Sequence, residues 1–208
     1  MMQAPRLIAI TDLSQLDPVT LLARLRGLAE AATPGSLALL LRDHAATGRQ
    51  RLGLGQEMAS LARSTSQALW VADRIDLALL LEADGLHLGE GSVPASAARK
   101  LWGIGRWLSR AWHRAELSNA AELEGVNALL LSPVLSERKG RPPLGLHALA
   151  RCSQAAALRE SVLVYALGGV TSDNAASCLA AGASGVAAIG AALASDPSAL
   201  LGALGIAR

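Results

Sequence analysis

Eight short apolar runs recur along the chain, and each is followed by a longer stretch that can form a helix. The runs cover residues 7–11, 36–42, 68–72, 85–89, 106–111, 128–132, 162–167 and 185–190. Strands that are apolar on both sides are typical of parallel sheets whose two faces are covered. Eight successive strand–helix units predict an α/β fold, a (β/α)8 TIM barrel, as a single domain over residues 1–208.

The helical stretches between the runs support this order. They cover residues 17–32, 48–66, 75–83, 94–102, 114–124, 145–158, 171–181 and 196–206. The first opens with Asp17 and Pro18, an N-cap followed by proline at the first helical position. The alternative is a doubly wound open sheet, but its GxGxxG fingerprint is absent, because Thr11, Asp12 and Leu13 follow the first run.

Composition excludes several other classes of protein. Apolar residues make up 51% of the chain, which argues against disorder. Residues 174–195 are uncharged and of membrane-spanning length, but their glycines divide them into a short helix and a strand. The 19 cations form no stripe, so no nucleic-acid partner is expected. Cys152 and Cys178 form no CxxC motif and are expected to be reduced, in a cytoplasmic protein without a membrane segment.

A TIM barrel places its functional residues at the carboxyl ends of the strands. Polar side chains lie at or just after the carboxyl ends of several apolar runs, and three of the four histidines are among them. The candidate substrate-binding and catalytic residues are Arg42, His44, Asp73, His87, His113, Ser132 and Lys139. Structural alternatives stay open: His113 could begin the next helix, His87 could fill the barrel interior, and Asp73 could cap a helix.

Glycine-rich turns follow the seventh and eighth runs. Glycine lets backbone N–H groups approach an anion closely, and the loops after strands seven and eight of such barrels often bind phosphate. The candidate phosphate-binding residues are Gly168, Gly169, Gly190 and Ala191. They predict a phosphorylated ligand, with tight turns alone as the alternative.

Five motifs in this order resemble the thiamine phosphate synthase/TenI family. They are LIAITD (7–12), LLLRDH (39–44), WVADRIDLALLLEADGLHLGEGSVP (70–94), SPVLSERKG (132–140) and ALGGVTSDNAASCLAAGASGVAAIGAAL (166–193). The resemblance covers nearly the whole chain and implies the same barrel. In the synthase, a glutamine, an arginine and a lysine on strand two hold a pyrimidine pyrophosphate, and two aspartates hold magnesium.

The chain departs from this pattern at several positions of the synthase site. Leu40 stands at the glutamine position and His44 at the lysine position, while Ala72, Ser92 and Glu137 replace an asparagine, the second magnesium-binding aspartate and a threonine of the phosphate loop. Departures on one side of the site suggest that the pyrophosphate chemistry is lost. No metal or cofactor is then expected.

The resemblance leaves three hypotheses. The first is a TenI-like thiazole tautomerase that binds a thiazole phosphate and moves a proton with His113 as acid and base. The second is a thiamine phosphate synthase that uses magnesium, held by Asp73 with Glu90 as a replacement carboxylate. The third is a non-catalytic sensor that keeps only the phosphate pocket. The expected partner is a phosphorylated thiazole or a related small molecule, and a homodimer is possible.

Overall fold

Eight parallel strands close into a barrel in the computed structural model, which describes residues 3–117, 121–159 and 162–208. The strands are β1 (Leu7–Ile10), β2 (Leu37–Leu41), β3 (Ala68–Ala72), β4 (Gly85–Leu88), β5 (Trp107–Trp112), β6 (Ala128–Leu131), β7 (Leu163–Leu167) and β8 (Gly185–Ala188). Each strand pairs with the next, and β8 pairs with β1, so the sheet has no free edge. The predicted (β/α)8 barrel is therefore confirmed.

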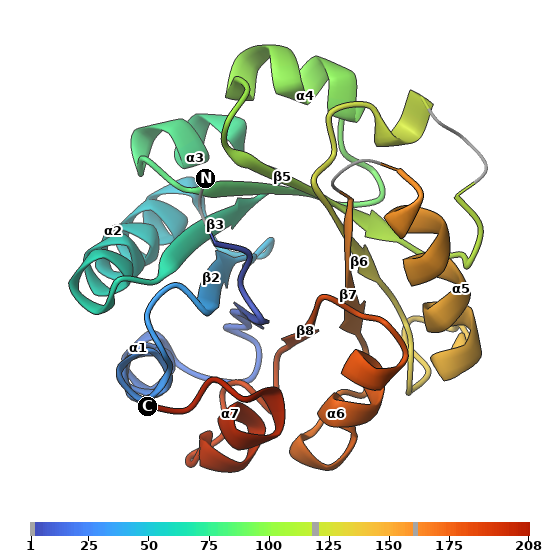
Figure 1. Ribbon diagram of the computed structural model, residues 1–208. Helices are drawn as coiled ribbons and strands as arrows, with labels where there is room; N and C mark the ends of the chain where they lie inside the picture. Colours follow the sequence, from blue (N-terminus) through green and yellow to red (C-terminus); the bar gives the residue numbers. More distant parts are fainter. Residues whose placement is uncertain (1–2, 118–120, 160–161) are drawn as a thin grey trace.

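Helices surround the barrel in a ring (Figure 1). In the described part of the chain they are α1 (Pro18–Ala31), α2 (Gly48–Thr65), α3 (Ile75–Leu80), α4 (Ala95–Trp102), α5 (Gly145–Ala157), α6 (Ser172–Ala180) and α7 (Ser198–Leu204). Asp17 caps α1 as predicted, because its carboxylate accepts hydrogen bonds from the amides of Val19 and Thr20.

The helix predicted over 114–124 is wrong for the described part of that range. Only a short 3-10 helix, η1 (Ala121–Leu123), forms there, while residues 118–120 lie outside the described residues. The buried apolar residues Leu117 and Leu123 are six positions apart. Positions with that spacing fall on different sides of a helix, so no single helical face could bury both. His113 consequently follows β5 directly without beginning a helix.

The uncharged run 174–195 belongs to the barrel. Most of α6, all of β8 and the turns after β8 lie within it, and the four residues of β8 are buried in the core. Among the described residues, no helix combines the length and the apolarity that a membrane span requires.

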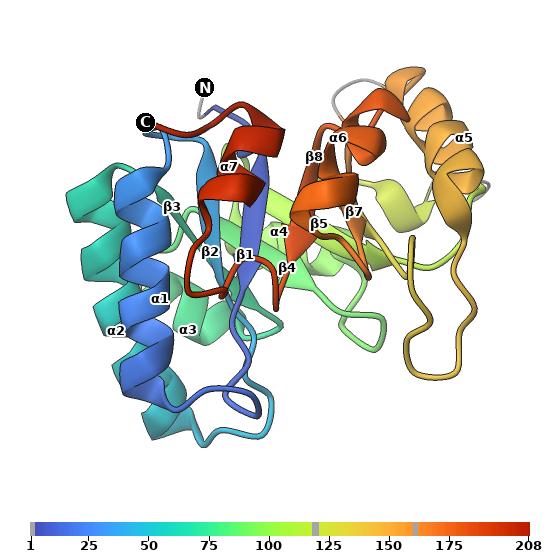
Figure 2. The ribbon, with the colours of Figure 1, turned by 90° about the horizontal axis from the view of Figure 1, so that it is seen from below.

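The loops after the strands gather at one end of the barrel. In Figure 2 the loops that follow β1, β2, β4 and β6 extend to the same side, and the two chain termini lie on the other. Parallel strands make this arrangement inevitable, because all their carboxyl ends face one way. The residues that close the apolar runs therefore meet at this end.

Candidate functional site

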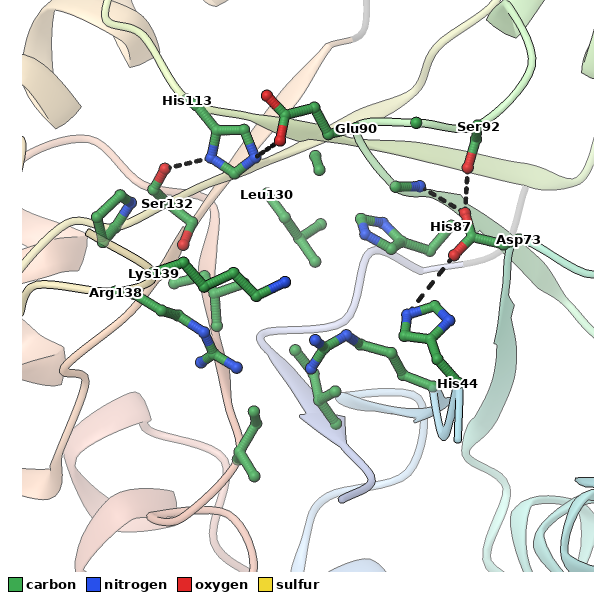
Figure 3. Close-up of a pocket in the computed structure, with 18 of the residues that line it drawn as sticks. His44, Asp73, His87, Glu90, Ser92, His113, Leu130, Ser132, Arg138 and Lys139 are labelled. Carbon is green, nitrogen blue, oxygen red and sulfur yellow. Dashed lines mark hydrogen bonds and ion pairs between the residues drawn. The ribbon is translucent and has the colours of Figure 1, made fainter. Parts of the chain in front are cut away.

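A cavity of about 710 Å³ opens at the carboxyl end of the barrel, and we call it the mouth cavity. All seven substrate-binding and catalytic candidates line it: Arg42, His44, Asp73, His87, His113, Ser132 and Lys139. They come from the ends of β2, β3, β4 and β5 and from the residues that follow β6 (Figure 3). Residues far apart in the sequence thus meet around one space.

A second cavity, of about 530 Å³, adjoins the first, and we call it the strand-7/8 cavity. All four predicted phosphate-binding residues line it: Gly168, Gly169, Gly190 and Ala191. The two cavities share Leu167, Ile189 and Arg138 in their walls. The two cavities therefore adjoin each other at the barrel mouth.

Gly169 is closely packed against the loop that follows β6. It adopts φ +75°, and a Cβ atom placed on it would lie 2.8 Å from the backbone nitrogen and the side chain of Ser136. A side chain at this position would be strained and would push that loop away. Glycine here allows the turn after β7 to lie directly against the loop after β6.

Asp73 is fixed by several contacts at the edge of the mouth cavity. Its Oδ1 accepts hydrogen bonds from the amide of Gly89 at 2.7 Å and from the hydroxyl of Ser92, and its Oδ2 lies 3.7 Å from His44 Nε2. Burial opposes its ionisation, but these hydrogen bonds outweigh it, with a smaller contribution from His87 and His44 when they are protonated, so the pKa of Asp73 lies below its ordinary value. Its backbone has φ +62°, in the left-handed region that aspartate tolerates better than most residues.

His87 is buried at the base of the same cavity. Its Nδ1 lies 2.9 Å from the hydroxyl of Ser109, and its exposed fraction is 7%. Burial lowers the pKa of His87 to about 4, although the charge of Asp73 works in the opposite direction. At neutral pH His87 is therefore an uncharged hydrogen-bonding group.

The low pKa of His87 predicts a loss of stability in acid. Above pH 6.5 the side chain is neutral in both folded and unfolded chains, but between pH 6.5 and about 4 only the unfolded chain takes up the proton. The free energy of unfolding should fall by about 3 kcal/mol across that window through this residue alone. Urea titrations at stepwise pH should show a shallower fall for His87→Gln, and parallel curves for the two proteins would contradict this account.

His113 is held in one orientation at the rim of the mouth cavity. Its Nδ1 lies 2.6 Å from the backbone carbonyl of Ser132, which can only accept, so Nδ1 carries a hydrogen. The other nitrogen, Nε2, lies 3.8 Å from Glu90 Oε2. His113 therefore presents Nε2, the nitrogen that can exchange a proton, on the cavity side (Figure 3).

Several cations line the mouth cavity among apolar residues. Arg42, Lys139 and the unpredicted Arg138 all line it. Burial lowers the pKa of His44 against the pull of Asp73, and the cations nearby lower it further, so His44 is mostly neutral at pH 7. His44 therefore does not replace the charge of the lysine that the family resemblance places there.

Glu137, which stands at the threonine position of the family's phosphate loop, does not border the barrel mouth. Glu137 is exposed and lines none of the cavities at the barrel mouth, whereas the next residue, Arg138, lines the mouth cavity and the strand-7/8 cavity. Sequence alone gave no signal for this, because the direction of a side chain in an irregular loop depends on turn geometry.

Comparison with known proteins agrees with this arrangement. The profile of a family described as thiamine monophosphate synthase (TMP-TENI) matches residues 7–192. The chain belongs to the thiamine monophosphate synthase/TenI family. It is 36% identical over 190 residues to the thiamine-phosphate synthase of Chlorobium phaeovibrioides, covering 90% of this chain and 86% of the relative.

Two further relatives carry similar names. The thiamine-phosphate synthase of Moorella thermoacetica is 35% identical over 164 residues, covering 77% of this chain and 76% of its own. The solved structure of thiamine phosphate pyrophosphorylase from Pyrococcus furiosus superposes with a TM-score of 0.81 at 26% identity, covering 96% of this chain and 95% of that one. Two of these three relatives are named thiamine-phosphate synthases and the third a thiamine phosphate pyrophosphorylase, and none of the three is named a tautomerase.

Two of the departures from the family pattern, Leu40 and Ala72, lie in the hydrophobic core of the barrel. Both side chains are fully buried and neither lines the mouth cavity. Apolar residues at these two positions fill the barrel interior. Their effect on a ligand in the mouth cavity is therefore indirect.

The departure at Ser92 leaves Asp73 as the one magnesium ligand that the resemblance retains. Glu90 does not take the vacant role in this arrangement, because it pairs with Arg141 and turns toward His113 (Figure 3). Among the described residues, no group of three or more His, Cys, Asp or Glu side chains is arranged to hold a metal ion. Magnesium nevertheless binds through as few as one carboxylate when substrate phosphates supply the other oxygens, so Asp73 fits that minimal requirement.

Proposed function

We propose that the protein is a thiamine-phosphate synthase, which joins a pyrimidine pyrophosphate to a thiazole phosphate. The observation that carries this proposal is the pair of adjoining cavities, one lined by cations and one by glycine-rich turns. A condensation needs both substrates at once, and holding them in contact is a large part of catalysis. The names of the relatives at 35–36% identity support the same reaction.

The cationic wall suits the pyrophosphate half of that reaction. As the bond between the pyrimidine methylene carbon and pyrophosphate breaks, negative charge gathers on the leaving group, and the thiazole nitrogen forms the new bond to the carbon. Arg42 and Lys139 would stabilise that charge from the protein side. Asp73 would hold magnesium, which when bound supplies further positive charge to the pyrophosphate.

The strand-7/8 cavity suits the phosphate of the thiazole. Gly168, Gly169, Gly190 and Ala191 present backbone at its wall, and α6 begins there with Thr171 as its N-cap. Backbone N–H groups and a helix N-terminus both favour a bound anion. The thiazole ring would then extend toward the mouth cavity, where the other substrate lies.

A thiazole tautomerase remains a second candidate, because His113 is oriented for proton transfer. Replacing His113 by glutamine should lower the rate of aromatisation of a thiazole carboxylate phosphate roughly 100- to 10,000-fold if His113 is its acid and base. The measurement is the ultraviolet absorbance of the aromatic product, with His147→Gln as the matched control, since His147 is exposed and lines none of the described cavities at the mouth. Unchanged turnover in His113→Gln would remove this candidate.

The experiment that tests the leading proposal is direct. The protein is mixed with both synthase substrates and magnesium, and thiamine phosphate is separated and quantified. A ligand that binds with neither reaction detectable would favour a sensor instead.

A further inference from the structure

A tight turn carries Arg138 over the barrel mouth. The amide of Arg138 donates to the carbonyl of Arg141 at 3.1 Å, and the amide of Arg141 donates back at 3.0 Å. Between them Lys139 and Gly140 have φ values of +52° and +72°, as in a type I′ turn. The backbone therefore holds residues 138 and 141 side by side at the base of the turn.

Arg141 ties this turn to a different loop. Its Nη2 lies 2.8 Å from both carboxylate oxygens of Glu90, which follows β4. Both side chains are partly exposed, at 41% and 61%, so the pair contributes modestly to stability. The main effect of the Arg141–Glu90 pair is on position. It holds the turn across the mouth, with Arg138 directed inward (Figure 3).

Arg138 lies where three cavities meet. Besides the mouth and strand-7/8 cavities, it lines a third cavity of about 480 Å³ between the loops after β1 and β2, which we call the strand-1/2 cavity. Among the residues that the structure describes, Arg138 alone lines all three. Figure 3 shows Arg138 and Lys139 pointing into the mouth from the same loop, across from His44 and Asp73.

The charge around Arg138 is unbalanced. Neither Arg138 nor Arg42 forms an ion pair with a carboxylate in the part of the chain that the structure describes. Burial lowers the pKa of Arg42 and the positive charge of Arg138 lowers it further, while the carboxylates of Asp12, Asp43 and Asp73 act in the opposite direction without outweighing these two causes. Two cations that face one space without a shared carboxylate repel each other until an anion lies between them.

We propose that Arg138 is a further substrate-binding residue, which together with Arg42 holds a diphosphate group where the three cavities meet. This inference rests on the proposed function and adds to it a residue outside the positions that the family resemblance supplies. Arginine suits the role because its planar fork donates two parallel hydrogen bonds to phosphate oxygens. Arg138 would also restore the positive charge that the neutral His44 does not provide.

Calorimetric titration with inorganic pyrophosphate tests this directly. The titrations are made in EDTA, so that the affinity reports the protein's own cations, at one low and fixed salt concentration. Arg138→Gln should bind pyrophosphate roughly 10- to 100-fold more weakly than the unaltered protein, because it loses a charge-assisted hydrogen-bonding group. Arg138→Lys, which keeps the charge but not the fork, should fall between them.

Arg63→Gln is the matched control, since Arg63 is exposed at the end of α2 and lines none of the three cavities. It should bind pyrophosphate as the unaltered protein does, and all variants should share one melting temperature. Equal affinity of Arg138→Gln and the unaltered protein would overturn the inference, as would failure of the unaltered protein to bind pyrophosphate in EDTA. Arg138-dependent binding without any thiamine phosphate formation would uphold this inference and defeat the proposed function.

Discussion

An Arg42→Gln variant is expected to lose roughly 100- to 1,000-fold in kcat/KM for thiamine phosphate formation, the range seen when one charge-stabilising donor is removed from an active site. Arg42 directly follows β2, lies in the wall of the mouth cavity and also borders the strand-1/2 cavity. Its amide donates to the hydroxyl of Thr11 at 2.9 Å, so the backbone at this position is fixed. Glutamine keeps much of the side chain's length but removes the charge that a leaving pyrophosphate requires.

The fold should be unaffected by that change. Arg42 has no ion-pair partner within the described residues, so glutamine leaves no carboxylate unpaired. Steady-state kinetics of Arg42→Gln and Arg63→Gln, with melting temperatures for both, separate a site effect from unfolding. An Arg42→Gln enzyme within about threefold of the unaltered kcat/KM would show that this guanidinium does not stabilise the transition state.

The largest effect on stability is expected from a single methyl group in β8. In Gly185→Ala the new Cβ would lie 2.5 Å from the carbonyl oxygen of Arg6 and 2.8 Å from the ring of Tyr165. Neither neighbour can move freely, because the Arg6 carbonyl accepts from Val186 and the Tyr165 hydroxyl donates to the carbonyl of Pro5 at 2.8 Å. We expect the free energy of unfolding to fall by about 3 kcal/mol or more.

Gly202→Ala is the matched control for that substitution. Gly202 lies within α7, where an added Cβ meets nothing within 4 Å. Alanine should stabilise this helix by up to about 1 kcal/mol. Urea unfolding of both variants checks the pair, and a Gly185→Ala protein as stable as Gly202→Ala would mean that the barrel at β8 is looser than the packing indicates.

The barrel could be predicted from the sequence because its signals are local. Each apolar run carries its own strand, and the Asp17 cap and the Thr171 capping box mark helix starts by residue type alone. The helix expected at 114–124 is wrong for the described part of that range. The stretch is long enough for a helix, but its buried residues Leu117 and Leu123 do not fall on one helical face. Periodicity is the more reliable signal in such a short window.

Most of the candidate site was also predictable, because a barrel brings all the strand ends together. Arg42, Asp73 and His113 meet around one cavity for that reason. Arg138 was missed because its direction is set by the type I′ turn and the Arg141–Glu90 pair, which join segments 51 positions apart. A contact between residues so far apart in the sequence cannot be predicted from the residues that flank either of them.

The central claim is that the protein binds two phosphorylated substrates in the two adjoining cavities and joins them. The most direct measurement mixes the unaltered protein with hydroxymethylpyrimidine pyrophosphate, thiazole phosphate and magnesium, and quantifies thiamine phosphate and pyrophosphate over time. The account predicts that both products appear in equal amounts, that omission of either substrate abolishes them, and that Arg42→Gln slows them severely. Absence of thiamine phosphate from the unaltered, folded protein at saturating substrates and excess magnesium would contradict it.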